Sequence, residues 1–139
     1  MKSRIKWVEN VAFMAESGTG HTLVMDGAPD HGGRNLGPRP MEMLLMGMGG
    51  CTAFDVMQML KKSRQDVDDC VVELEAERSE DIPQVFTKIH AHFIVKGKGL
   101  KEHHVERAVS LSAEKYCSAS IMLGKTAEIT HDYEVIETS

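Results

Sequence analysis

The sequence predicts an α+β fold, and three observations lead to this prediction. Apolar and polar residues alternate over much of the first 25 residues and again over residues 70–76 and 89–95, as in strands with one buried face. The longest apolar segment, residues 40–64, separates these two groups and has the composition of a helix. Helical spacing returns over residues 101–116. The predicted order of elements is βββ-α-ββ-α-α-β, without an internal repeat.

The first three strands are short. Ile5 and Trp7 alternate with charged neighbours, and a second alternation around Phe13 ends at a Ser-Gly-Thr-Gly turn. A third strand is expected over residues 21–25. Residues 27–38 are rich in glycine and proline, so we expect a long irregular loop that is either a mobile connection or part of a site.

The apolar segment carries the residue types that helix ends favour. Pro40 suits the first helical position, Glu42 suits the first turn, and basic residues fill the last turn. Residues 41–51 are apolar on every side, which predicts a helix that is buried all round. A glycine pair directly before Cys51 lowers helix stability. The pair therefore allows either close packing of another backbone or space for a substrate beside the thiol.

The next two strands carry a cysteine and two histidines. Cys70 shares the predicted core face with Val72 and Leu74, where a cysteine usually acts as a small hydrophobic residue. We therefore predict a structural role for it. His90 and His92 point the same way from their strand and could hold a metal ion. Because the sequence offers no obvious third ligand, a solvated face is the favoured interpretation.

A further cysteine follows the second predicted helix. Ser118 is a good N-cap for a short helix that Gly124 closes. Cys117 would then lie beside a helix N-terminus, where partial positive charge lowers the pKa of a thiol. A last strand is expected over residues 127–135.

Composition limits the function classes. The net charge is −5 and the pI is near 5.8, which argues against nucleic-acid binding. Three cysteines without a CxxC pair predict neither a disulfide scaffold nor a zinc site, and they suit a cytoplasmic protein with reduced thiols. No signal peptide is visible, and glycines and charges interrupt the apolar helix, so no membrane span is expected. The length fits one domain, residues 1–139.

Two segments, PMEMLLMGMGGC and EKYCSAS, resemble the two cysteine motifs of the osmotically inducible protein C and organic hydroperoxide resistance (OsmC/Ohr) family, with its YhfA-like branch as the nearest match. The resemblance covers nearly the whole chain. It implies an intertwined homodimer whose antiparallel sheets wrap around two central buried helices. It also implies a peroxidase for small hydrophobic hydroperoxides, with Cys51 as the peroxidatic and Cys117 as the resolving cysteine. Such chemistry needs no metal or flavin and uses a dithiol reductant, for which a lipoylated protein is a candidate.

The sequence departs from the best-studied members of the family around the thiol. The resemblance implies an arginine that activates the thiolate and a glutamate that orients it. Glu42 lies nine residues before Cys51, so on a regular helix the two side chains face opposite ways. Glu42 therefore serves the site of a second subunit, or the glycines break the helix, or Glu42 is only a favourable first-turn acid. Arg34 is the first candidate for the arginine and Arg39 the second.

Two alternatives to the peroxidase remain. The first is a binding or sensing protein, in which an apolar pocket holds a small ligand and the thiols respond to oxidation without efficient turnover. The second is another reaction of the Cys51 thiol with an electrophile. That reaction needs a histidine base, and no histidine has a spacing that points to Cys51.

Overall fold

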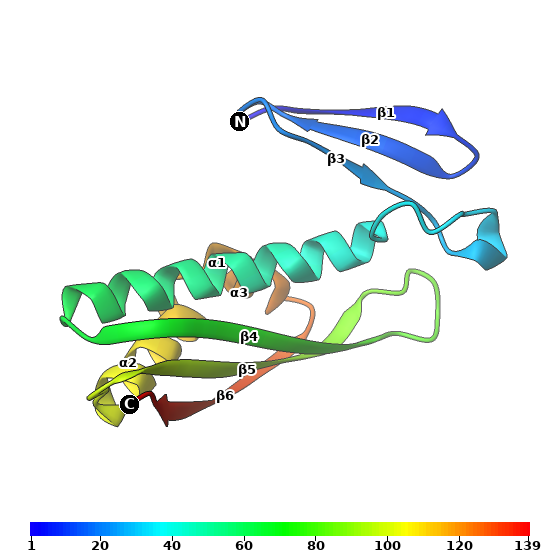
Figure 1. Ribbon diagram of the computed structural model, residues 1–139. Coiled ribbons are helices and arrows are strands. Elements are labelled where there is room, and N and C mark those ends of the chain that lie inside the picture. Colours follow the sequence, from blue (N-terminus) through cyan, green and yellow to red (C-terminus); the bar gives the residue numbers. More distant parts are fainter. The chain divides into compact units, whose positions relative to one another are not determined.

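The computed structural model describes residues 1–139, which divide into two compact units, residues 1–44 and 45–139 (Figure 1). The elements follow the predicted order, so the α+β class is confirmed. The assignment of the whole chain to one domain stays a prediction.

The N-terminal unit contains a three-stranded antiparallel sheet. Its strands β1 (Ser3–Glu9), β2 (Ala12–Ser17) and β3 (Thr22–Met25) pair in the order of the sequence. The predicted turn after β2 forms, because the amide of Ser17 donates to the carbonyl of His21 at 2.8 Å. Ile5 and Trp7 remain more than half exposed. This sheet therefore leaves much of its apolar surface uncovered within one chain.

Asp26 organises the glycine-rich loop that follows β3. Its buried carboxylate accepts hydrogen bonds from the amides of Gly27, Arg34 and Leu36 at 2.8 to 3.2 Å. These bonds, chiefly the one from Arg34, hold the pKa of Asp26 below its usual value. A short 3₁₀ turn, Pro29–His31, lies inside the loop. The loop is thus tied down by one side chain.

Helix α1 (Pro40–Lys62) begins with a capping box. The carboxylate of Glu42 accepts a hydrogen bond from the backbone amide of Arg39 at 2.9 Å, three residues back. The helix ends where Arg64 adopts the left-handed conformation with φ of 59°. Both predicted ends are close to the observed ones.

The C-terminal unit has a three-stranded mixed sheet. Strand β4 (Asp66–Arg78) pairs antiparallel with β5 (Phe86–Lys98), and β6 (Glu128–Glu137) pairs parallel with β5. The expected antiparallel pairing is present between β4 and β5, and the parallel β5–β6 pair departs from it. A parallel pair needs a long crossover. The crossover consists of α2 (Glu102–Leu111), a π-helical turn (Ser112–Tyr116) and α3 (Ser118–Leu123).

The hydrophobic core of this unit lies between one face of the sheet and the helices α1 and α2. Val56 and Leu60 of α1 are fully buried there. The predicted core row of β5 is confirmed, because its members are at most 3% exposed (Ile89, Ala91, Phe93 and Val95). By length and composition alone α1 could cross a membrane. Its second half packs into the core with β5 and α2 through Val56 and Leu60.

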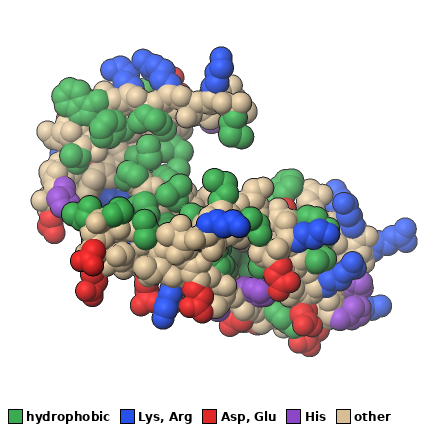
Figure 2. Space-filling model, turned by 180° about the vertical axis from the view of Figure 1, so that it is seen from behind, with side chains coloured by type: hydrophobic (Ala, Val, Ile, Leu, Met, Phe, Trp, Pro, Cys, Tyr) green, Lys and Arg blue, Asp and Glu red, His purple; other side chains and the backbone are tan.

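The prediction that the first half of α1 is buried all round is wrong for a single chain. Met48 and Gly49 are buried, but Met46 is 49% exposed, and farther along the helix Phe54 is 65% exposed. Figure 2 shows hydrophobic side chains along the edge of this unit where α1 lies.

The two glycines before Cys51 differ in the space around them. A side chain at Gly49 would collide with Leu74, whereas the space beside Gly50 is open.

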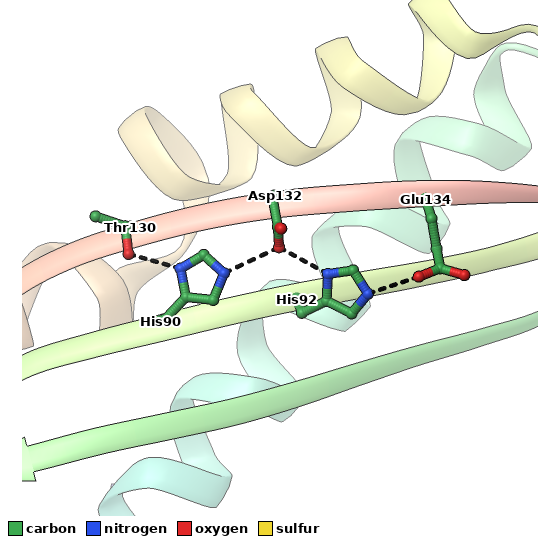
Figure 3. Close-up of polar contacts among 5 residues, drawn as sticks. All are labelled: His90, His92, Thr130, Asp132 and Glu134. Carbon is green, nitrogen blue, oxygen red and sulfur yellow. Dashed lines mark hydrogen bonds and ion pairs between the residues drawn. The ribbon is translucent and has the colours of Figure 1, made fainter.

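The opposite face of the sheet carries a polar row (Figure 3). The carboxylate of Asp132 on β6 contacts His90 and His92 at 2.9 and 2.7 Å, and Glu134 contacts the other nitrogen of His92. Hydrogen bonds to Asp132 and Glu134 raise the pKa of His92. The two histidines do face the solvent side, as predicted. Their acidic neighbours were missed because the parallel pairing with β6 was not foreseen.

Candidate thiol site

Two cysteines that are far apart in the sequence lie close together in the C-terminal unit. Cys51 belongs to α1, and Cys117 lies between the π-helical turn and α3. Their sulfur atoms and a carboxylate oxygen of Asp55 all lie within 4.8 Å of one another. Both thiols are free. The fold therefore assembles two thiols and a carboxylate at one point.

Cys117 is held by the turn in front of it and the helix behind it. Its backbone amide donates to the carbonyl of Ser112 at 2.8 Å, which closes the π-helical turn. Its sulfur accepts a hydrogen bond from the amide of Ser120 at 3.3 Å. Cys117, and not Ser118 as predicted, is thus the N-cap of α3. The side chain is fully buried.

Burial raises the pKa of the Cys117 thiol. The hydrogen bond from Ser120 acts in the opposite direction but is the smaller effect, and the neighbouring Cys51 adds to the increase. The expectation of a lowered pKa at this helix N-terminus is therefore wrong. The reason is that the side chain is fully buried, so desolvation of the thiolate outweighs its hydrogen bond.

Asp55 is the residue of this site that the sequence analysis missed. It lies one helical turn after Cys51, so both side chains emerge from the same side of α1. Its carboxylate accepts a hydrogen bond from the hydroxyl of Ser112 at 3.2 Å, and that hydroxyl contacts Thr52 at 2.7 Å. Ser112 and Thr52 are both buried. A cysteine followed by an acid four residues later on an apolar helix was the available signal.

An open groove of about 870 Å³ runs between α1 and α2 beside Asp55. Phe54, Met59 and Leu111 contribute apolar surface to it. Arg107 and Lys62 contribute positive charge. The groove can therefore hold a molecule with an apolar body and a polar or anionic end.

Cys70 lies apart from the two other thiols. It packs against the hydrophobic core from β4, and burial raises the pKa of its thiol. Its backbone pairs with Val95 of β5. This placement agrees with the predicted structural role.

The other predicted site residues, Arg34, Glu42 and Arg39, belong to the N-terminal unit, where each has local partners. Arg34 forms an ion pair with Glu9, and Glu42 caps α1. The guanidinium of Arg39 donates to Asn35 and to the carbonyl of Gly37. A role of Arg34 and Glu42 at the thiol stays a prediction.

Comparisons with known proteins identify the family of the chain. Residues 31–132 match the family model described as OsmC-like protein. Protein YhfA of Escherichia coli K12 is 53% identical over 136 residues, which cover 98% of each chain. A solved structure described as structural genomics has a TM-score of 0.90 and 51% identity, and the match covers 99% of this chain and 100% of the other. The organic hydroperoxide resistance protein OhrB of Bacillus subtilis has the same fold, with a TM-score of 0.62, 18% identity and 96% of each chain covered.

Proposed function

Because the chain belongs to the OsmC-like protein family, we propose that it is a thiol peroxidase that reduces organic hydroperoxides. The observation that carries this proposal is the approach of the Cys51 and Cys117 sulfur atoms to within 4.8 Å. Two free thiols this close can form a disulfide after a small rearrangement. The name of the Bacillus subtilis neighbour, an organic hydroperoxide resistance protein, supports the choice of substrate class.

The two cysteines take different roles because their exposure differs. Cys51 is partly exposed, so its thiolate is the one that meets the substrate and attacks the distal peroxide oxygen. This step yields an alcohol and a sulfenic acid on Cys51. The buried Cys117 thiol then attacks the sulfenic sulfur, which forms the disulfide and releases water. An external dithiol, for which a lipoylated protein is a candidate, reduces the disulfide and is itself oxidised.

Asp55 is placed to handle protons in the second step. Its carboxylate lies beside both sulfur atoms, and Ser112 holds it in position. Because burial disfavours the Cys117 thiolate, a base that accepts this proton would speed disulfide formation. Arg34 and Glu42 remain predicted as the pair that activates Cys51.

The groove beside Asp55 supports a hydrophobic substrate. Its apolar residues can cover an alkyl or aromatic group, which hydrogen peroxide lacks. We therefore expect preference for organic hydroperoxides over hydrogen peroxide. The free thiols suit a reducing compartment, and the proposal places the protein in the cytoplasm.

A homodimer forms part of the proposal. Met46, Phe54 and Met57 leave apolar surface exposed along α1 in one chain. A second copy would cover such a surface. Sedimentation of a folded monomer at micromolar concentration would contradict the dimer.

A second candidate is a small-ligand-binding or redox-sensing protein without efficient turnover. It is favoured because burial raises the pKa of Cys117, and because no arginine or lysine within residues 45–139 donates a hydrogen bond to a cysteine sulfur. A thiol without a cationic partner is a slow nucleophile at neutral pH.

Steady-state kinetics with cumene hydroperoxide and hydrogen peroxide, with dihydrolipoamide as reductant, separate the two candidates. The peroxidase predicts turnover that is much faster with cumene hydroperoxide. It also predicts a reversible Cys51–Cys117 disulfide in the mass spectrum of peroxide-treated protein. A Cys51–Cys70 bridge would overturn the role of Cys117. If stoichiometric hydroperoxide leaves Cys51 unoxidised, the ligand-binding candidate replaces the peroxidase.

A further inference from the structure

We propose that the reduced protein binds one Zn²⁺ ion per chain through Cys51, Asp55 and Cys117. The family resemblance implies thiol chemistry without a metal, so this site lies outside the proposed function. Thiolates, imidazoles and carboxylates are the ligands of zinc in proteins, and three protein ligands with an open fourth position make a common type of zinc site. The triad supplies two such sulfurs and one such oxygen.

The upper limit on the distances is compatible with a metal site. Two sulfurs bound tetrahedrally to zinc lie roughly 3.8 Å apart, as follows from zinc–sulfur bonds of about 2.3 Å. The three donor atoms already lie within 4.8 Å of one another, so side-chain shifts of about 1 Å complete the site. A disulfide requires the sulfurs to approach to about 2.0 Å. The reduced arrangement is therefore within reach of a metal site as well as of the disulfide.

Cys117 and Asp55 each have a supporting hydrogen bond of the kind found around metal sites. The amide of Ser120 donates to the sulfur of Cys117 at 3.3 Å. The hydroxyl of Ser112 donates to the carboxylate of Asp55 at 3.2 Å. These donors orient the sulfur and the oxygen and stabilise their charged forms.

Charge and access also favour a cation. Metal binding places two thiolates beside one carboxylate, and three negative charges in a partly buried site need a counter-ion. A divalent cation brings the site to a net charge of −1, and the two thiols release their protons when it binds. Cys51 is partly exposed, which gives the ion an entry path.

Metal binding and disulfide formation exclude each other because both use the same two sulfur atoms. The bound ion would therefore protect both thiols from alkylation and from oxidation. Cys70 lies outside the triad and would stay unprotected. This difference gives the test an internal control.

The polar row on the open face of the sheet is the competing location for a metal. Asp132 contacts both His90 and His92, and histidine and carboxylate side chains also bind zinc. The experiment must therefore separate a thiolate site from a histidine site.

The test uses tag-free, reduced, full-length protein under anaerobic conditions. Titration with Co²⁺ should produce a thiolate-to-cobalt charge-transfer band that saturates at one ion per chain, and Zn²⁺ should displace the cobalt. Asp55→Asn should weaken binding about tenfold or more. Cys51→Ser removes one of the two thiolate ligands and should reduce the charge-transfer band by half or more, whereas Cys70→Ser and His92→Gln should leave it unchanged. Circular dichroism checks that each variant is folded.

Alkylation of the wild-type protein keeps the test decisive if a triad variant fails to fold. Saturating Zn²⁺ should slow alkylation of Cys51 and Cys117 and leave that of Cys70 unchanged, as read by mass spectrometry. Absence of a thiolate–cobalt band, or its loss in His92→Gln, would overturn the proposal. Binding is measured without peroxide, so its outcome is independent of peroxidase activity. A protein that binds Zn²⁺ and reduces no hydroperoxide would keep this inference and overturn the proposed function.

Discussion

The glycine-rich loop and the thiol site use polar side chains in opposite ways. In the loop, Asp26 accepts three backbone amides, and Glu42 accepts the amide of Arg39. These bonds connect residues of one short stretch of chain. At the thiol site, side chains from α1 and from the crossover point at one another.

This difference in hydrogen-bond partners distinguishes residues that hold the backbone in place from residues that are available for chemistry. A carboxylate whose lone pairs are taken by backbone amides has a fixed structural task. Asp55 instead receives a single side-chain hydroxyl and lies beside two sulfur atoms. Substitutions in the loop should therefore act on stability, and those at the thiol site on reactivity.

Of these substitutions, Cys51→Ser should cause the largest loss of hydroperoxide consumption. A serine hydroxyl is a far weaker nucleophile than a thiolate, so hydroperoxide consumption should fall by at least about a hundredfold. The free energy of unfolding should change little, because the two side chains have nearly the same size. Cys70→Ala is the matched control and should lower stability modestly while activity stays intact. A large loss of activity in folded Cys70→Ala would show that the mechanism assigns the reaction to the wrong cysteine.

Cys117→Ser should stop turnover at an identifiable step. The first oxidation of Cys51 needs only that thiol, so one equivalent of alcohol should still form. The sulfenic acid then lacks its partner thiol and should accumulate or proceed to sulfinic acid. Trapping with dimedone and mass spectrometry measures this species. Unchanged steady-state turnover would mean that an external thiol resolves the sulfenic acid.

Asp26→Ala should lower stability and leave the thiols reactive. The substitution leaves the amides of Gly27, Arg34 and Leu36 without their acceptor, so the thermal midpoint should fall by a few degrees. The folded-state pKa of Asp26 is depressed, so its contribution is present above the unfolded-state pKa and is lost as the pH falls through the folded-state value. The variant should accordingly lose part of the acid sensitivity of the wild type. Equal acid sensitivity in both proteins would contradict this role.

Substitutions of Glu42 should have the smallest effects. They separate a role in capping α1 from a role at the thiol. Glu42→Ala removes the capping box and should cost roughly 0.5–1 kcal/mol in urea unfolding. Glu42→Gln keeps an acceptor for the Arg39 amide and should cost less. If Glu42 also orients an activating arginine, as the family resemblance implies, Glu42→Gln should slow oxidation of Cys51 without loss of stability. Wild-type kinetics in Glu42→Gln would confine the residue to its cap.

Much of the fold follows from the sequence because its patterns are local. The alternation of Ile89, Ala91 and Phe93 marks a strand face wherever the strand lies, and Pro40 and Glu42 mark a helix start. The parallel partner of β5 depends on how the crossover folds back, which no local pattern specifies. For the same reason Asp132 was not recognised as the neighbour of His90 and His92.

The thiol site was only partly predictable. The local surroundings of Cys51 and Cys117 can be read from the sequence. That their sulfur atoms lie close together was indicated only by the family resemblance. Asp55 was not singled out because nothing in the sequence places Ser112 beside it. The lowered pKa expected for Cys117 failed because a helix N-terminus is recognisable locally, whereas burial is a property of the whole unit.

The parallel pairing of β5 and β6 has a consequence for the order of folding. The chain must complete α2, the π-helical turn and α3 before β6 can return to β5, and such distant pairings form slowly because a large loop must close first. Cys117 lies inside this loop, whereas Cys51 lies in a helix that can form by itself. During synthesis the two thiols should therefore stay separated until the crossover has folded onto α1. The capacity to make the Cys51–Cys117 bridge should appear only at that stage.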